Sequence, residues 1–258
     1  DVAGDITLDA DGGDIRLSDA GTQFGKFTNS SSDFIISSSV NDKDMKFAGA
    51  DGGADITALT LDMSAAGAAA FNSYLTATAV YGKDDGNTGI QFDGSDVITL
   101  HTGGAEHMKI DANGIVTKPN QPAFLAQPAS TINNLNSGAN NSIVFGTERF
   151  DQNADYDASS GVFTAPVTGK YMFNVTFYLN NIDSAAGYYE PRLDTSNRSY
   201  YVNFDPDFGQ DNSYFTISFH QLVDMDANDT ADINIHQNGG SSQTDISAAS
   251  TFSMYLVC

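Results

Sequence analysis

The stretch FGTERFDQNADYDASSGVFTAPVTGKYMFNV, residues 145–175, decides the fold of this chain. Its last part, from Gly169 to Val175, alternates large apolar residues with smaller or polar ones, which is the period of a half-buried strand. Just ahead of it, Pro166 and Gly169 stand at turn spacing. We therefore predict a strand, a polar loop, a short strand at residues 162–164, a turn and then a long central strand.

Seven positions in this stretch follow a fixed spacing: Phe145, Asp151, Tyr156, Phe163, Gly169, Tyr171 and Phe173. The spacing resembles the signature of the globular head of the complement-one-q family, which shares a jelly-roll fold with the tumour necrosis factor family. Val175 departs from it, because an aromatic residue is usual there, and Met254 stands where the family's closing strand commonly has Gly. The resemblance implies a jelly-roll head over residues 142–258, with three heads packed around a threefold axis. It says little about function, since all seven residues determine the fold.

Composition places the whole chain in the all-β class. The 258 residues include 24 Gly, 17 Phe and 11 Tyr, and they show no convincing helical periodicity. The formal net charge is −22, and the two sides of Lys118 share it evenly. Such uniform acidity argues against nucleic acid as a partner, because phosphates require clusters of Lys and Arg. It also argues against anionic membrane surfaces.

The single cysteine, Cys258, excludes an internal disulfide framework. No apolar run approaches the roughly 18 residues that a membrane span needs, and we find no signal peptide. Stability must therefore come from burial and from assembly, and we expect no membrane insertion. Residues upstream of Asp1 could contain an anchoring segment.

The first part of the chain is repetitive. Gly4–Asp9 is echoed by Gly13–Leu17 and again by Ala54–Asp62, each a short alternating strand closed by Asp, Gly or Ala. So little apolar mass per repeat could not hold a core in a single copy, whereas stacked repeats or chains wound about a common axis could. An irregular β-sandwich is the alternative. A hairpin is also predicted over residues 89–100, with its turn at Asp93-Gly94.

Several segments of this half resemble the shafts and necks of bacteriophage tail fibres: the short GDI repeats, TALTLDMSAAG (residues 57–67), ITLHTGGAEHMKIDANG (residues 98–114) and VTKPNQPAF (residues 116–124). The resemblance implies an elongated, trimeric β shaft or neck over residues 1–118. A connector rich in Pro, Asn, Ser and Gly, with a first strand, then covers residues 119–141. The head follows at residues 142–258.

The sequence contains no nucleophile elbow, zinc-protease motif, phosphate loop or nucleotide fingerprint. The four histidines are scattered and never stand at metal-ligand spacing. Carboxylate pairs for glycoside cleavage remain open, because 33 acidic residues form many chance pairs. We predict that the protein is not an enzyme.

The sequence requires no cofactor, and calcium is the one ion that two acidic loops fit. Asp224, Asp226 and Asn228 offer oxygen ligands at alternating positions, as in a hand-type loop, but Ile235 stands where a bidentate Glu belongs. Asp9, Asp11 and Asp14 form a second partial set. The alternative for both loops is a set of solvated turn residues.

Aromatic residues gather in the segment after the signature and suggest a recognition surface. Tyr with Asn, Asp and Arg is typical of surfaces that contact carbohydrate or protein. Alternation in the strands will bury about half of the set. The candidate ligand-binding residues are Tyr188, Tyr189, Arg192, Tyr200, Tyr201, Phe208 and Tyr214.

Together these patterns favour a homotrimeric virion fibre or spike that attaches to its host. Its head would bind a glycan or protein on a bacterial surface, and its N-terminal end would bind other virion structural proteins. Its location would be the virion surface, outside the cell. Two alternatives stay open: a capsid decoration or extracellular filament protein, and a secreted lectin-like binding module.

Overall fold

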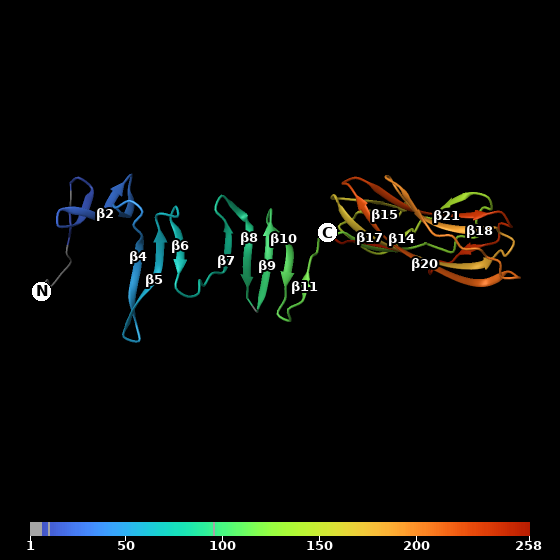
Figure 1. Ribbon diagram of the computed structural model, residues 1–258, viewed down its shortest axis with the longest axis horizontal. Coiled ribbons are helices and arrows are strands. Elements are labelled where there is room, and N and C mark those ends of the chain that lie inside the picture. The colour runs from blue at the N-terminus through green and yellow to red at the C-terminus, as the bar shows by residue number, and fades with distance from the viewer. Residues whose placement is uncertain (1–6, 10, 95) are drawn as a thin grey trace. The chain divides into compact units, whose positions relative to one another are not determined.

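The computed structural model describes residues 7–9, 11–94 and 96–258, and the chain divides into two compact units between Thr78 and Ala79. All regular structure in the described residues is β-strand. None of these residues forms a helix long and apolar enough to cross a membrane. Figure 1 shows the strands in chain order.

The first unit contains two separate antiparallel three-stranded sheets, in the orders β1-β2-β3 and β4-β5-β6. Their strands are β1 (Asp14–Asp19), β2 (Thr22–Ser30), β3 (Asp33–Ser38), β4 (Met45–Asp51), β5 (Ala54–Asp62) and β6 (Ala68–Phe71). The predicted repeats at Gly13–Leu17 and Ala54–Asp62 are thus confirmed as strands. The first repeat, Gly4–Asp9, lies mostly outside the described residues.

The second unit begins with a five-stranded antiparallel sheet in the order β11-β10-β9-β8-β7. Its strands are β7 (Ala79–Gly82), β8 (Asp85–Asp93), β9 (Val97–Thr102), β10 (Ala105–Ile110) and β11 (Val116–Thr117). The predicted hairpin is confirmed, because β8 ends at Asp93 and pairs there with Val97 of β9.

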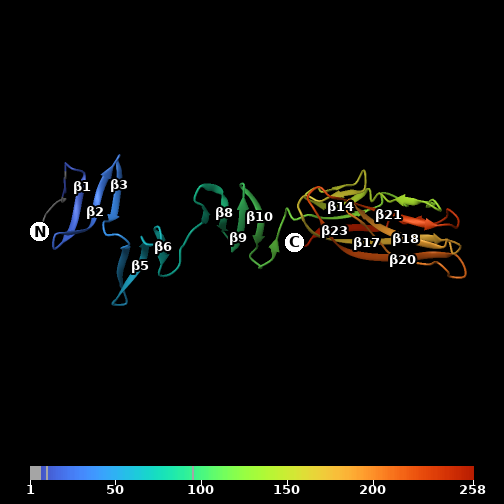
Figure 2. The same cartoon turned by 45° about the horizontal axis from the view of Figure 1, so that its top comes forward.

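The rest of the second unit is a two-layered sandwich, which we call the head (Figures 1 and 2). The first head sheet has the order β14-β12-β23-β17-β20, and β22 pairs with β17. The strands are β12 (Ala123–Gln127), β14 (Thr147–Gln152), β17 (Gly169–Ile182), β20 (Asn212–Met225), β22 (Asp245–Ile246) and β23 (Thr251–Leu256).

The second head sheet has the order β15-β16-β21-β18-β19, and β13 pairs with β21. The strands are β13 (Asn140–Ser142), β15 (Tyr156–Asp157), β16 (Val162–Thr164), β18 (Tyr188–Thr195), β19 (Ser199–Tyr201) and β21 (Thr230–Asn238). The predicted succession of a strand, loop, short strand, turn and long strand is confirmed as β14, β16 and β17, although the predicted loop also contains the two-residue strand β15.

The core lies between the two head sheets and is strongly aromatic. Phe252 of β23 is at its centre, with ring centroids 5.0 Å from Phe124, 5.6 Å from Phe145 and 5.9 Å from Phe173. Odd-numbered residues of β17 from Tyr171 to Leu179 point into this core, as the alternation predicted. Val175 is fully buried among them, so the smaller residue still occupies a core position.

Three further signature residues, Asp151, Tyr156 and Gly169, have structural roles in the head. Asp151 accepts the backbone N–H groups of Asp155 (3.3 Å) and Tyr156 (3.0 Å), which closes the turn after β14. The buried Tyr156 hydroxyl donates to the carbonyl of Phe145 at 3.1 Å. A Cβ atom at Gly169 would lie 2.6 Å from the carbonyl oxygen of Cys258, so only glycine fits there.

Candidate functional site

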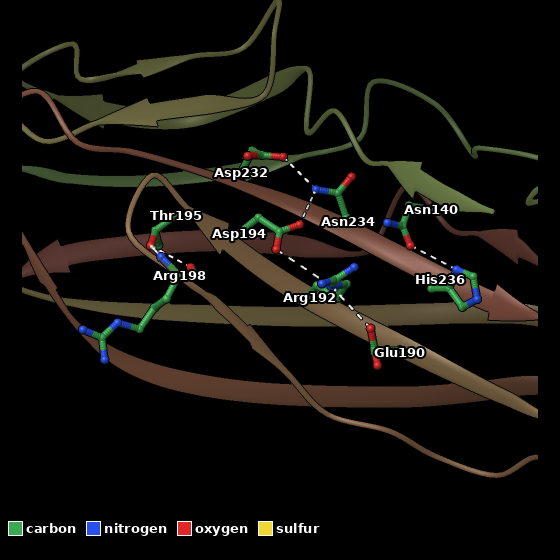
Figure 3. Close-up of polar contacts among 9 residues, drawn as sticks. All are labelled: Asn140, Glu190, Arg192, Asp194, Thr195, Arg198, Asp232, Asn234 and His236. Atoms are coloured by element: carbon green, nitrogen blue, oxygen red, sulfur yellow. Dashed lines mark hydrogen bonds and ion pairs between the residues drawn. The ribbon is translucent and has the colours of Figure 1, made fainter.

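The outer face of β18 and β21 carries a row of polar side chains that the strand alternation turns away from the core. On β18, Tyr189 and Leu193 point inward, so Glu190, Arg192 and Asp194 point outward. The two strands pair antiparallel, which sets Glu190 opposite His236 and Arg192 opposite Asn234 (the β18–β21 face). Figure 3 shows these side chains beside one another.

Arg192 lies at the centre of the β18–β21 face. Its Nε is 3.3 Å from Glu190 Oε1 and 3.8 Å from Asp194 Oδ1. Its guanidinium carbon lies 5.9 Å from the ring centroid of Tyr201 on the neighbouring β19, within cation–π range. The cation is thus held between two carboxylates and an aromatic ring, with 23% of its side chain exposed.

Asn234 links two acidic residues on the same face. Its Nδ2 donates to Asp194 Oδ2 at 2.9 Å and to Asp232 Oδ2 at 2.8 Å. Burial raises the pKa of Asp232, and the negative charge of Asp194 raises it further, against a lowering by the hydrogen bond from Asn234. The site is therefore acidic overall, with three carboxylates and one arginine.

The other end of the face carries an aromatic residue and a histidine. Tyr188 and His236 have ring centroids 5.8 Å apart, and His236 Nδ1 is 3.0 Å from the Oδ1 atom of Asn140 on β13. Together with Tyr201, which is 56% exposed, Tyr188 gives the face one aromatic ring at each side of the polar row. Flat apolar rings beside hydrogen-bonding groups suit ligands such as sugars and polar peptides.

The structure brings together only some of the predicted ligand-binding residues. Tyr188, Arg192 and Tyr201 share the β18–β21 face and its neighbour β19. Tyr189 does not, since it is fully buried and its hydroxyl accepts the backbone N–H of Asp183 at 3.1 Å. Including Tyr189 was wrong, because the alternation of β18 turns it into the core. Tyr200 is partly buried and packs against the same core.

The remaining two predicted residues lie elsewhere. Phe208, in the segment between β19 and β20, lies 5.6 Å from the ring of Phe215. Tyr214, which is 82% exposed, stands on β20 in the first head sheet. Neither residue is on the β18–β21 face. The prediction grouped them with that face only because they are near it in the sequence.

A polar pocket of about 390 Å³ lies near Tyr214. Its lining residues are Asn134, Asn181, Asp211, Asn212, Ser213, Gln243 and Asp245. The carboxylates already have partners. Asp211 accepts from the backbone N–H of Ser184 (2.9 Å) and from Gln243 Nε2 (2.9 Å), and its pKa is lowered chiefly by the latter bond. We regard this pocket as part of the head's structure.

The acidic loop after β20 uses its oxygen atoms to hold the turn. Asp224 pairs with Lys170, and Asp226 Oδ1 accepts from Thr168 at 3.4 Å. The amide of Asn228 donates to the carbonyl of Ala165 at 2.8 Å, and its φ of 74° suits Asn in a tight turn. Across the described ranges, no group of three or more His, Cys, Asp or Glu side chains could hold a metal ion. The geometry favours the solvated-turn alternative here.

The second acidic set is also engaged in local contacts where it is described. Asp14 accepts from Thr28, whose hydrogen bond is the main cause of the lowered pKa of Asp14. Ion pairs with Arg16 (3.4 Å) and Lys26 (3.7 Å) complete its surroundings.

Sequence reasoning missed six residues of the face: Asn140, Glu190, Asp194, Asp232, Asn234 and His236. Alternation within 188–194 and 230–236 marks most of them as outward-pointing. What it could not supply is the register that sets one strand beside the other, because the paired residues are 36–50 positions apart in the sequence.

Comparison with known proteins identifies the head. The family model described as the C1q domain matches residues 123–257. Among solved structures, the globular domain of zebrafish complement 1qA is 20% identical, with a TM-score of 0.40, and covers 54% of this chain and 98% of its own. Murine APRIL at pH 8.5 is 7% identical, with a TM-score of 0.40, and covers 53% and 99%. A comparison with curated proteins gives no match.

Proposed function

The chain belongs to the C1q domain family, and from this premise we propose that its head is a homotrimer that binds a receptor on a surface outside the cell. Domains of this family and of the tumour necrosis factor family are generally non-enzymatic binding modules, commonly homotrimeric and typically extracellular. The family fixes the class of activity, and the residues of this chain must supply the ligand specificity.

The observation that carries the proposal is the β18–β21 face. Two tyrosine rings flank a row in which Glu190, Arg192 and Asp194 offer both hydrogen-bond donors and acceptors. Such a face can stack on the apolar side of a sugar ring while its carboxylates accept from hydroxyl groups. A glycan or a polar protein segment on a bacterial surface is the ligand that we propose.

The proposed homotrimer is supported by the outer face of the first head sheet. Phe150, Leu222 and Tyr255 project from it and are 48–51% exposed. Tyr255 and Leu222 flank Met172 in one cross-strand row. Three copies of the head would cover these side chains, and a trimer presents three weak sites at once. At effective concentrations of order mM, such avidity raises binding by roughly 10²–10⁴-fold.

Binding of the full chain to intact bacteria and to isolated envelope glycans tests this function. We expect the double variant Tyr188→Ala with Tyr201→Ala to bind at least tenfold more weakly, since both rings are lost. Tyr74→Ala is the matched control, because Tyr74 is 94% exposed but lies outside the head. Undiminished binding by the double variant would remove the β18–β21 face from the proposal.

We propose further that the protein is a virion fibre or spike, with residues 1–118 as its shaft or neck and its N-terminal end bound to other virion proteins. The support is the resemblance of residues 57–67 and 98–114 to tail-fibre segments. A secreted binding module is an equally supported alternative, because its family membership is the same. A capsid decoration protein or an extracellular filament protein is the third alternative.

Labelling with an antibody against the head separates these alternatives. Gold particles at the tips of virion appendages would support the fibre, whereas labelling spread over the capsid would support decoration. Antigen found only in the particle-free culture medium would favour the secreted module and contradict the fibre.

A further inference from the structure

The β7–β11 sheet places two apolar rows on one face, and Ala79, Tyr81 and Val97 are the larger apolar exceptions on the other. Cross-strand register places four apolar residues in one row: Val80, Ile90, Leu100 and Met108. Two residues further along each strand, a second row follows on the same face: Phe92, Ile98, Ile110 and Val116. Residues two apart in a strand share a face, so both rows form one continuous apolar surface.

The opposite face of the same sheet is mainly polar. The row between the two apolar ones contains Ala79, Gln91, Thr99, Lys109 and Thr117. Thr99 donates to Asp93 Oδ2 at 3.0 Å and is 3.0 Å from His101 Nε2, so this face is tied together by hydrogen bonds. The charges of the sheet therefore lie away from the apolar rows.

The apolar face is exposed in a single copy of the chain. Its six most accessible side chains are 37–50% exposed, from Ile98 and Leu100 on the central strand to Val116 at the edge. This leaves on the order of 500 Å² of contiguous apolar surface, at the upper end of what monomeric proteins show. An open sheet without cover on one face is also a marginal structure in water.

The sheet is held tightly to the head. Gln152 Nε2 of β14 donates to the carbonyls of Lys118 (2.7 Å) and Gln121 (2.8 Å), which follow β11 directly. Gln121 Nε2 donates to the carbonyl of Leu256 at 2.8 Å, and the Leu256 amide donates to Pro122 at 3.0 Å. The strands that hold this joint, β14 and β23, belong to the first head sheet, whose outer face is the proposed trimer surface.

The same segregation recurs in the β4–β6 sheet of the first unit. There the pairing sets Met45 beside Leu61, and Leu59 between Phe47 and Phe71, on one face. Phe47 and Phe71 are 50% and 46% exposed. An unrelated partner would need a separate complementary apolar surface for each of these sheets. In a symmetric homo-oligomer, each copy carries the same apolar faces, so every face has an apolar counterpart.

On these grounds we propose that the apolar face of the β7–β11 sheet is a contact surface between copies of this chain, in which three such faces enclose a shared apolar interior. The inference rests on the proposed homotrimer. The head trimer brings the three joints together, so the sheets meet at high effective concentration. The uncharged face is where copies of a chain with a net charge of −22 can approach with least repulsion.

Site-specific cross-linking of the full chain tests this surface. In a Cys258→Ser background, which removes the natural thiol, Leu100→Cys places a thiol on the apolar face of the central strand β9. His101→Cys is the matched control, since it is the next residue and faces the other way. We expect a short bismaleimide to link Leu100→Cys chains in pairs at least tenfold faster than His101→Cys chains.

The solution mass of each variant, measured in parallel, separates the two proposals. A trimer in which Leu100→Cys fails to cross-link, or in which both variants cross-link equally, overturns the apolar-face contact and leaves the head trimer intact. A monomer overturns both. Protection of the Leu100→Cys thiol from a monofunctional maleimide in the trimer, but not after dissociation in denaturant, supports the contact by a second readout.

Discussion

At the scale of single residues, Gly169 shows most directly why the signature requires its glycine. The position begins β17, where the last residues of the chain pack against it. A Cβ atom there would meet the Cys258 carbonyl at 2.6 Å and Leu256 Cδ1 at 2.9 Å. Both distances are shorter than real Cβ contacts, so any side chain must displace the edge of β23.

We predict that Gly169→Ala lowers the free energy of unfolding of the head by about 1–3 kcal/mol, the usual cost of overpacking. Urea denaturation measures the change. Gly146→Ala is the control, because the nearest atom to its Cβ would lie at an ordinary 3.5 Å. Equal effects of the two substitutions would show that crowding at Gly169 is not the cause.

A second residue-scale prediction concerns Asp232, whose pKa is raised by burial and by Asp194. A raised pKa means that the folded state binds the proton more tightly, so ionisation costs stability as the pH rises through the folded pKa. Asp232→Asn should therefore stabilise the head at pH 7. Partial exposure screens the charge, which limits the gain to about 0.5 kcal/mol. This stabilisation by Asp232→Asn should vanish below pH 3.8, which is the ordinary pKa of an aspartate side chain.

Thermal unfolding across this pH range measures the effect, and Asp157 supplies a control of opposite sign. Hydrogen bonds from Ser159 and Ser160 lower the pKa of Asp157 to about 2, so its ionised form stabilises the fold above 3.8 and that stability is lost as the pH falls towards 2. Asp157→Asn should destabilise at pH 7. A loss of stability in both variants would contradict the assigned role of Asp232.

At the scale of elements, β23 is the strand on which the first head sheet depends. It pairs with β12 on one side and β17 on the other, and it contributes Phe252 to the centre of the core. The Phe252 ring has four aromatic neighbours within 6 Å: Phe124, Phe145, Tyr156 and Phe173. Because protein cores are close-packed, the neighbours of Phe252 could fill its volume only by moving.

Phe252→Ala should cost about 3–5 kcal/mol of head stability, because it removes a large side chain and leaves a cavity. The urea midpoint of the head measures this loss. Tyr201→Ala on β19 is the comparison, since that side chain is 56% exposed and lies on the second head sheet, away from the proposed trimer surface. Similar losses from both would contradict the central position of Phe252.

The elements also show which features of the head a sequence can specify. Residues 145–175 predicted β14, β16 and β17, because local alternation and turn residues determine those strands. The β18–β21 face was not predictable in the same way. Tyr188 and Tyr189 are identical in type, and only the phase of the alternation distinguishes the exposed ring from the buried one. Likewise, His236 lies opposite Glu190 only because β21 pairs with β18, which is distant from it in the sequence.

At the scale of the whole molecule, the outer face of the first head sheet is the surface through which we propose that the head assembles. Leu222 of β20 is 48% exposed there and lies in the row that contains Met172 and Tyr255. A carboxylate at this position would have to be buried without a partner in any assembly that uses the face. The oligomeric state is therefore sensitive to single substitutions.

We predict that Leu222→Asp raises the dissociation constant of the trimer at least a hundredfold, which corresponds to about 2.7 kcal/mol. Analytical ultracentrifugation over a range of concentrations measures it. Ser199→Asp, on the edge strand of the second head sheet, should leave the trimer unchanged. A variant Leu222→Asp that remains fully trimeric at nanomolar concentration would exclude this face from the interface.

The closeness of Gln121 and Leu256 has a practical consequence for the evolution and engineering of this protein. Gln121, at the start of the head, contacts Leu256 in its last strand, so the head can be exchanged or transferred as one unit. A different sandwich could be spliced in at this junction without remodelling what precedes it. The same geometry would let the head be inserted into a surface loop of another protein with almost no linker, together with the binding face that we propose for it.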